Sequence, residues 1–278
     1  MTIAPWTVYL SITSPTLRHL HRIEQPVNYT LLRNATAILS FGGLRFLIDP
    51  MLDPAHARLP VGNTPNQHPN PLVELPDGWQ DLIAHPDALV VTHLHQDHFD
   101  STAASTLDHD LPLIGQPDDV DRLTAFGFRN LLPVADTISF HDVHVSRTAG
   151  HHGTGDIGKA MAPVSGFVFQ ASNESTVYLA GDTIWCDEVA GAITTHNPDV
   201  IVVNASGARF LEGDPIVMTA EDVALVHRAA PEALVIVVHL EAINHCLETR
   251  SHYRHRLPEL GVDMHHIRIP EDGEHVIW

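Results

Sequence analysis

Short runs of branched apolar residues recur along the chain, with turn-forming residues between them. The segment TAILSFGGLRFLIDP (36–50) contains two such runs joined by Gly42 and Gly43, which tolerate the positive φ angles of a tight turn, so it predicts a β-hairpin. Further apolar runs predict buried strands at 88–92, 111–115, 137–148, 166–170, 176–180, 199–205 and 233–239.

Helical patterns interrupt this strand series at two places. The segment PDDVDRLTAFG (117–127) has a proline in its first turn and a glycine past its end, as helices commonly do. The segment TAEDVALVHRAA (219–230) begins at Thr219, a residue type that caps helix amino termini. It lies between two predicted strands and so completes a βαβ unit. A strand-rich first half and an α/β second half together predict sheets packed on each other with helices outside.

From Asp53 to Trp79 the chain is rich in proline and has almost no periodicity. A loop of this length inside a compact domain is usually either functional or disordered. We predict a packed loop that lies over a functional site. Its expected apolar anchors are Leu59, Val61, Leu72, Val73 and Trp79. The alternative interpretation of the segment 54–79 is a mobile surface insertion.

Length and composition favour one domain over residues 1–278. The chain has 44% hydrophobic residues, enough for a sizeable core, and no linker-like tract or internal repeat divides it. The net charge of −19 argues against a nucleic-acid partner, because a protein that follows a phosphate backbone needs a cationic surface. Two cysteines are too few for a disulfide framework.

The hydropathy pattern also argues against membrane insertion. The longest apolar runs, such as ALVIVV (233–238), are far too short to span a bilayer. The first thirty residues lack a basic start followed by an apolar stretch, and prolines interrupt them. We therefore expect a cytoplasmic protein.

The string VTHLHQDHF (91–99) places three histidines and an aspartate directly after a predicted strand. His93 and His95, two residues apart in an extended segment, point to the same side and offer two imidazole nitrogens to one divalent ion. Asp97 and His98 lie past the strand end, where the chain can turn toward a second ion. The arrangement suits a two-metal hydrolytic centre. The competing interpretation is a solvated polar loop in a histidine-rich chain.

Six residues cannot complete two coordination shells, so further ligands are expected at other strand ends. Candidates are the pair His151 and His152 in TAGHHGTGD (148–156), Asp182 in LAGDT (179–183) and His239 in VIVVHLEAINH (235–245). Any one of them is more often an ordinary polar residue at a strand end than a ligand. Their agreement in position favours a metal centre at the rim of a sheet, where ligand sites of α/β proteins concentrate.

This series resembles the metallo-β-lactamase superfamily, whose signature is H-x-H-x-D-H followed by a histidine, an aspartate and a final histidine at later strand ends. NATAILSFGGLRFLIDP (34–50), GDTIW and MTAEDV further resemble the group that includes L-ascorbate-6-phosphate lactonase and N-acylphosphatidylethanolamine phospholipase D. The resemblance implies an α/β fold, an αββα four-layer sandwich of two mixed β-sheets with helices on the outer faces. It also implies a dinuclear site in a cleft along the sheet edges.

The resemblance implies a ligand set as well. It assigns the first ion to His93, His95 and His152, the second to Asp97, His98 and His239, and the bridge between them to Asp182. His152 is preferred to His151 because the related pattern has its histidine directly before the small residue that Gly153 matches here; His151 becomes a supporting or pocket residue. No cysteine stands at the bridging position, so a true β-lactamase is not expected.

The implied activity is metal-dependent hydrolysis of a small or medium ester, lactone, amide or phosphoester by a metal-bridging hydroxide. Asp97 would share the proton as well as bind metal, and His245 would act as a general acid or else lie at the surface or cap a helix. Asp49 would orient a ligand histidine or be a plain strand-end aspartate. Side chains expected either to line the pocket or to serve packing are Trp185, Arg209 and Phe210.

Two other functions compete with hydrolysis. One is a mononuclear iron oxygenase of the same fold, which would not need Asp97 and His98 as ligands. The other is a catalytically silent binding module, which should have lost at least one ligand. The expected cofactors are two divalent ions, zinc first, although manganese and iron also suit imidazole and carboxylate ligands. We expect a small-molecule substrate, selected by the loop 54–79 and by the segments after Asp182 and Asn204, and homo-oligomers are compatible with the sequence.

Overall fold

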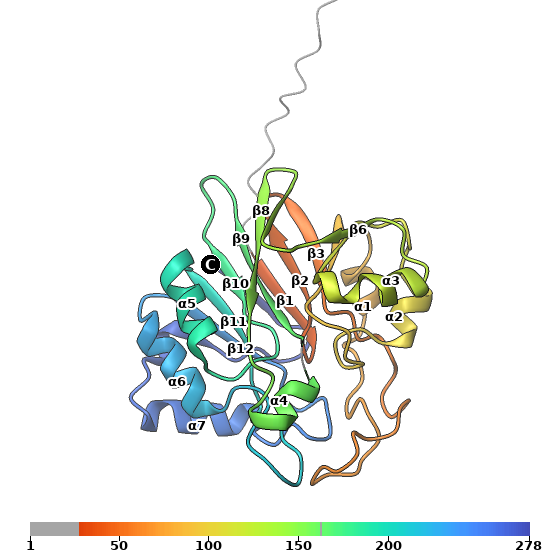
Figure 1. The fold of residues 1–278 in the computed structure, drawn as a ribbon. Coiled ribbons are helices and arrows are strands. Elements are labelled where there is room, and N and C mark those ends of the chain that lie inside the picture. The colour runs from red at the N-terminus through yellow and green to blue at the C-terminus, as the bar shows by residue number, and fades with distance from the viewer. Residues whose placement is uncertain (1–27, 162) are drawn as a thin grey trace, which may run out of the picture.

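Two mixed β-sheets stacked face to face form the centre of the molecule, with helices on both outer sides (Figure 1). The computed structural model describes residues 28–161 and 163–278, so most of the amino-terminal stretch inspected for a leader lies outside the described residues. The predicted α/β class and αββα sandwich are confirmed.

The first sheet has the strand order β14-β1-β2-β3-β4-β5-β6. Pairing is antiparallel from β14 to β3 and parallel from β3 to β6. The strands are β1 (Asn28–Arg33), β2 (Thr36–Phe41), β3 (Leu44–Ile48), β4 (Ala88–Val91), β5 (Leu113–Gly115), β6 (Leu131–Pro133) and β14 (His275–Ile277).

The second sheet has the order β13-β12-β11-β10-β9-β8-β7. It is antiparallel from β7 to β10 and parallel from β10 to β13. The strands are β7 (Thr137–Phe140), β8 (Val143–Ala149), β9 (Ser165–Gln170), β10 (Val177–Leu179), β11 (Val200–Asn204), β12 (Leu234–Val238) and β13 (Ile267–Arg268).

Helices α5 to α7 cover the outer face of the second sheet, and α1 to α3 lie on the outer side of the first (Figure 1). Within the part of the chain that the structure describes, no helix is long and apolar enough to cross a membrane. The helices are α1 (Trp79–Leu82), α2 (Ser101–Thr106), α3 (Val120–Ala125), α4 (Gly155–Met161), α5 (Asp187–His196), α6 (Ala220–Ala229) and α7 (Arg250–Glu259), with 3-10 turns at Pro117–Asp119 and Met264–His266.

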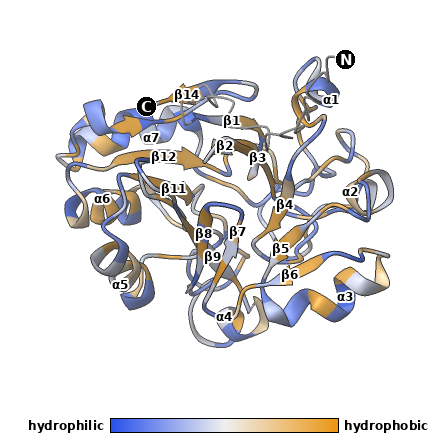
Figure 2. Cartoon of the chain, turned by 90° about the horizontal axis from the view of Figure 1, so that it is seen from above, coloured by the Kyte–Doolittle hydropathy of each residue, from blue (hydrophilic) through white to orange (hydrophobic). Residues whose placement is uncertain are grey.

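Strands buried on both faces hold the layers together. Along β11, Val200 and Val202 face the other sheet, whereas Ile201 and Val203 face the helices. This alternation follows from the two-residue period of a strand. Burying each such side chain contributes about 1.5 to 3 kcal/mol, and Figure 2 shows several of these central strands in the hydrophobic colour. The strand ends are therefore a rigid base for polar side chains.

Most local predictions are confirmed. The hairpin turns at Gly42 and Gly43, with φ angles of 60° and 67°, and a Cβ at Gly42 would lie 2.6 Å from a side-chain carbon of Val143. Thr219 begins α6 with a capping box shared with Asp222. The strands on either side of α6 are parallel, as a βαβ unit requires.

Five helices were not predicted: α1, α2, α4, α5 and α7. The polar sequence of α7, RSHYRHRLPE, buries only Arg250, Tyr253 and Leu257, so it shows almost no apolar period. Such helices owe their stability mainly to tertiary contacts, which a local pattern does not contain.

The proline-rich segment is a loop, as predicted, but two of its expected anchors are wrong. Leu59 is 88% exposed and Val73 is also exposed. The buried residues of the segment include Thr64 and Asn70, and Asn70 is hydrogen-bonded to Asn244 on the loop after β12. Polar contacts to a distant loop thus help to hold the segment.

Candidate metal centre

The seven predicted ligands follow the carboxyl ends of four strands and meet in one place. They come from the segments after β4, β8, β10 and β12, which belong to both sheets. Their ligand atoms form two groups, each with all atoms within 4.8 Å of one another: His93, His95 and His152 in one, and Asp97, His98, Asp182 and His239 in the other.

In the first group three imidazole nitrogens converge. His93 Nε2 lies 2.9 Å from His95 Nδ1, and His152 offers a third ring nitrogen within 4.8 Å of the ligand atoms of both. Zinc binds imidazole nitrogen at about 2.0 to 2.1 Å. Nitrogens that share one tetrahedral ion are therefore expected about 3 to 3.5 Å apart, and the group fits one divalent ion.

In the second group two histidines face two carboxylates. His98 Nε2 lies 3.2 Å from Asp182 Oδ2, and His239 Nε2 lies 3.3 Å from Asp97 Oδ2. Both ring nitrogens are buried, and neither has a hydrogen-bond partner of acceptable geometry. A buried polar atom without a partner is costly, so this group also fits a divalent ion.

Asp182 lies between the two groups. Its Oδ2 is near the nitrogens of His152 and His98, and its Oδ1 lies 3.7 Å from His239 Nε2 and accepts a hydrogen bond from Asn204 Nδ2 at 2.8 Å. Asn204 is the last residue of β11. Its contact with Asp182 was not predicted, because no sequence pattern around Asn204 indicates it. Asp182 thus lies within reach of nitrogens from both groups.

The outward nitrogens of the ligand histidines have partners of their own. Asp49 Oδ2 lies 2.8 Å from His98 Nδ1, and both oxygens of Asp49 accept hydrogen bonds from Thr92. His152 Nδ1 donates to the carbonyl of Ile216 at 2.7 Å. Because these contacts hold a proton on Nδ1, they direct the lone pair of Nε2 toward the centre.

Carboxylates and burial shift the pKa values of the histidines in the centre in opposite directions. Burial would lower the pKa of His98, but the carboxylates of Asp182 and Asp49 outweigh it and raise that pKa to about 10. The pKa of His239 is likewise raised by Asp182 against its burial. Burial lowers the pKa of His95 to about 4. Two buried carboxylates therefore demand positive charge beside them, which divalent ions would supply.

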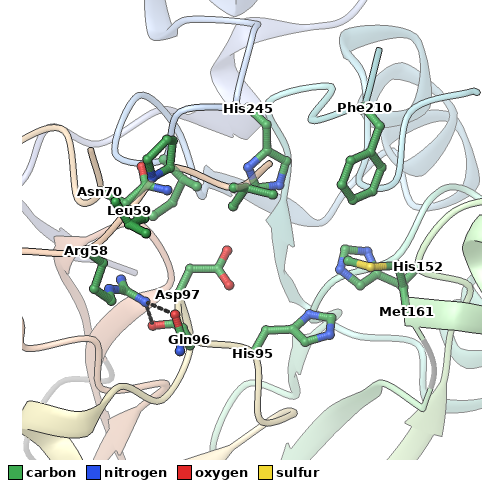
Figure 3. Close-up of a pocket in the computed structure, with 13 residues that line it drawn as sticks. Arg58, Leu59, Asn70, His95, Gln96, Asp97, His152, Met161, Phe210 and His245 are labelled. Atoms are coloured by element: carbon green, nitrogen blue, oxygen red, sulfur yellow. Dashed lines mark hydrogen bonds between the residues drawn. The ribbon is translucent and has the colours of Figure 1, made fainter. Parts of the chain in front are cut away.

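A cavity of about 290 Å³ opens above the centre, and His95, Asp97 and His152 point into it (Figure 3). His245 faces the same space and stacks on Phe210, with ring centroids 6.3 Å apart. It is only 6% exposed, so the surface alternative for this residue is wrong. Burial lowers the pKa of His245 to about 4, which favours the neutral ring at pH 7, and its function as a general acid stays a prediction.

The remaining candidates lie away from this cavity. His151 is half exposed and directs Nε2 to Glu188 Oε1 at 3.1 Å. Trp185 packs against the apolar cluster beneath the outer helices, and Arg209 Nε donates to the carbonyl of Gly207. Among the described residues the structure thus brings His152, not its neighbour His151, to the first group.

Residues 44–240 match the family profile described as "Beta-lactamase superfamily domain". The chain belongs to the metallo-β-lactamase superfamily. This metallo-β-lactamase-fold protein is 37% identical over 251 residues to the UPF0173 protein YddR of Bacillus subtilis, a match that covers 89% of the chain and 98% of YddR. The homologues place it among the UPF0173 metal-dependent hydrolases, whereas membership of the finer lactonase and phospholipase group is not shown.

Two solved structures are similar to this metallo-β-lactamase-fold hydrolase over almost their whole length. A possible metal-dependent hydrolase from Veillonella parvula is 33% identical with a TM-score of 0.88, covering 91% of this chain and 100% of that one. An isothiocyanate hydrolase from Delia radicum gut bacteria is 33% identical with a TM-score of 0.85, covering 90% and 99%.

Proposed function

We propose that this hydrolase uses two divalent metal ions, zinc first, to hydrolyse small, largely apolar substrates at an electrophilic carbon. The observation that carries the proposal is the position of Asp182, whose Oδ2 lies 3.4 Å from His152 Nε2 and 3.2 Å from His98 Nε2. A single carboxylate between two ligand groups is what a bridged pair of ions requires. Such a pair lowers the pKa of a shared water and polarises the substrate.

The residues around the centre would have distinct functions. The first ion would be held by His93, His95 and His152, the second by Asp97, His98 and His239, with Asp182 shared. Asp97 also lines the cavity, and its side chain is 17% exposed, so it is the carboxylate placed to take a proton from an incoming water. His245, neutral and buried, would accept a hydrogen bond from substrate or water.

The cavity supports an uncharged substrate. Its walls include the apolar side chains of Val61, Phe210 and Ile243. Arg58 is the one arginine or lysine among the described residues that line it, and its guanidinium is engaged by Asp53 at 2.8 Å and by the carbonyl of Gln96 at 2.6 Å. Beyond the proposed ions, a phosphoester would find no cationic side chain in the cavity other than this paired arginine, which favours carbon electrophiles over phosphoryl groups.

Candidate substrates follow from this chemistry. Isothiocyanates carry an electrophilic carbon between nitrogen and sulfur, and one 33% identical structure is an isothiocyanate hydrolase. Lactones, aryl esters and acyl amides present an electrophilic carbon too. Lactones and phosphodiesters are also the chemistries implied by the resemblance of the sequence to the lactonase and phospholipase D group.

The test is a substrate panel of these four carbon electrophiles and a phosphodiester, with apoprotein reconstituted separately with zinc, manganese and iron. We expect turnover of at least one carbon electrophile to rise until two equivalents of metal are bound, and to disappear in His95→Ala. Full hydrolysis after thorough chelation would contradict the proposal. Oxygen consumption with one bound iron would favour the mononuclear oxygenase instead.

A further inference from the structure

A second cluster of metal-ligating side chains lies beside the centre but outside it. His151 Nε2, Cys186 Sγ and a carboxylate oxygen of Glu188 all lie within 4.8 Å of one another. His151 and Glu188 are paired at 3.1 Å. Imidazole, thiolate and carboxylate are the three ligand types that zinc takes in proteins. The proposed dinuclear centre uses none of these residues.

The cluster is accessible to an ion from solvent. The side chain of His151 is 55% exposed and that of Glu188 is 37% exposed, while Cys186 is half-buried. Glu188 Oε2 is itself buried and has no hydrogen-bond partner. Three protein ligands at a half-open position leave the fourth site of a tetrahedral ion to water.

The cluster also joins the two segments that carry ligands of the centre. His151 precedes His152 after β8, whereas Cys186 ends the loop of Asp182 and Glu188 lies in the first turn of α5, which follows that loop. Hydrogen bonds already join these loops, because the His151 amide donates to Thr183 Oγ1 at 2.9 Å and the Ile184 amide donates to the His151 carbonyl at 2.9 Å.

We propose that His151, Cys186 and Glu188 bind a third divalent ion of zinc-like chemistry, which ties the loop of His152 to the loop of Asp182. The ion would restrain the two loops against each other without contacting the substrate cavity. This inference does not depend on the proposed hydrolysis, since its ligands are separate from those of the two-metal centre.

The thiol gives the site a signature of its own. None of the seven proposed ligands of the centre is a cysteine, so a sulfur-to-cobalt charge-transfer band would report a cysteine ligand outside that set. Apoprotein is titrated with cobalt(II) alone while the near-ultraviolet band and the number of bound ions are measured. We expect the band to develop with a third equivalent of cobalt and to be lost in Cys186→Ser and His151→Ala.

The matched control is Cys246→Ser, which removes the other cysteine, whose Sγ lies 3.6 Å from His239 Nδ1. This variant should keep the band and the third equivalent. A wild-type protein that binds cobalt without any thiolate band overturns the proposal, and so does a band that survives Cys186→Ser. Amide exchange of the segments 150–153 and 182–186 should also slow when the third ion binds, and unchanged exchange in that step contradicts the tie between the loops.

Discussion

Asn70 and Asn244, which are 174 residues apart in the sequence, are joined by two hydrogen bonds. Asn70 Nδ2 donates to Asn244 Oδ1 at 2.7 Å, and the main-chain N–H of Asn244 donates to Asn70 Oδ1 at 2.9 Å. The side chain of Asn244 also accepts from the Val61 amide and donates to Thr64 Oγ1. Asn244 is buried and directly precedes His245. One side chain therefore holds the proline-rich loop against the wall of the cavity.

Asn244→Ala should loosen this loop. Because several buried polar groups lose their partner at once, we expect the free energy of unfolding to fall by about 2 to 3 kcal/mol. We also expect amide exchange of residues 58–72 to accelerate, and KM to rise more than kcat falls. Chemical denaturation, amide exchange and steady-state kinetics measure these effects. Asn66→Ala is the control within the same loop, because Asn244 is hydrogen-bonded to the main-chain carbonyl of Asn66 and not to its side chain. Equal effects in both variants would show that the hydrogen bonds of the Asn244 side chain do not hold the loop.

Asp182→Asn keeps the shape of the side chain but removes the charge that faces both ligand groups. We expect the bound metal to fall below two equivalents and turnover to fall by at least about a hundredfold. Mutation of a residue that only hydrogen-bonds to a metal ligand already lowers metal affinity or activity by about 10- to 100-fold. Elemental analysis of the purified protein measures the metal. Asp199→Asn, which changes an exposed carboxylate before β11, should retain both ions. Two tightly bound ions in Asp182→Asn would rule out the bridging position.

Asp49→Asn should weaken metal binding although Asp49 is not a proposed metal ligand. The new amide would present a donor toward His98 Nδ1, so the ring would have to move its proton to Nε2, the atom that faces the centre. We expect metal affinity to fall by about 10- to 100-fold, measured by competition with a chelator. Asp87→Asn, in which the carboxylate instead accepts from the Arg45 amide, is the control. Unchanged affinity in Asp49→Asn would mean that His98 does not need this partner.

The pH dependence of turnover should report the burial of His245. Burial lowers its pKa from 6.5 to about 4, and the neutral form predominates above the pKa. Activity that needs the neutral ring is therefore kept as the pH falls through 6.5 and is lost only near 4. We expect His245→Gln to lower kcat by about a hundredfold at neutral pH with metal content unchanged.

The measurement is kcat from pH about 5 to 8 with metal content determined at each pH. Phe210→Leu is the control, because it removes the ring that stacks on His245 but leaves the imidazole nitrogens in place. A wild-type loss of activity centred near pH 6.5 that disappears in His245→Gln would contradict the lowered pKa.

Much of the centre was predictable because its residues follow strands with strong local patterns. The string 91–99 is compact and comes directly after the apolar run of β4, so its position at a strand end could be inferred without a structure. His152, Asp182 and His239 also follow recognisable strands. Their convergence was predicted from their shared position at strand ends and their assignment to two ions from the resemblance, and the structure brings all of these side chains within two groups.

Contacts between distant loops were not predictable in the same way. Asn204 holds Asp182, and Asn34 Nδ2 donates to the carbonyl of Asp97 at 3.1 Å, yet neither residue has a local signal. For Trp185 and Arg209 the sequence left pocket lining and packing open for the same reason, since the direction of a side chain after a strand depends on the neighbouring loop.

The sequence by itself determined the strand periodicity, the hairpin at Gly42 and Gly43, and the residue types available for metal binding, because each depends on neighbours a few positions away. Only the tertiary structure decided which of His151 and His152 faces the centre, that His245 is buried with a lowered pKa, and that Asn244 is hydrogen-bonded to the proline-rich loop. These outcomes depend on desolvation and on hydrogen bonds between segments far apart in the chain, which exist only once the two sheets have packed.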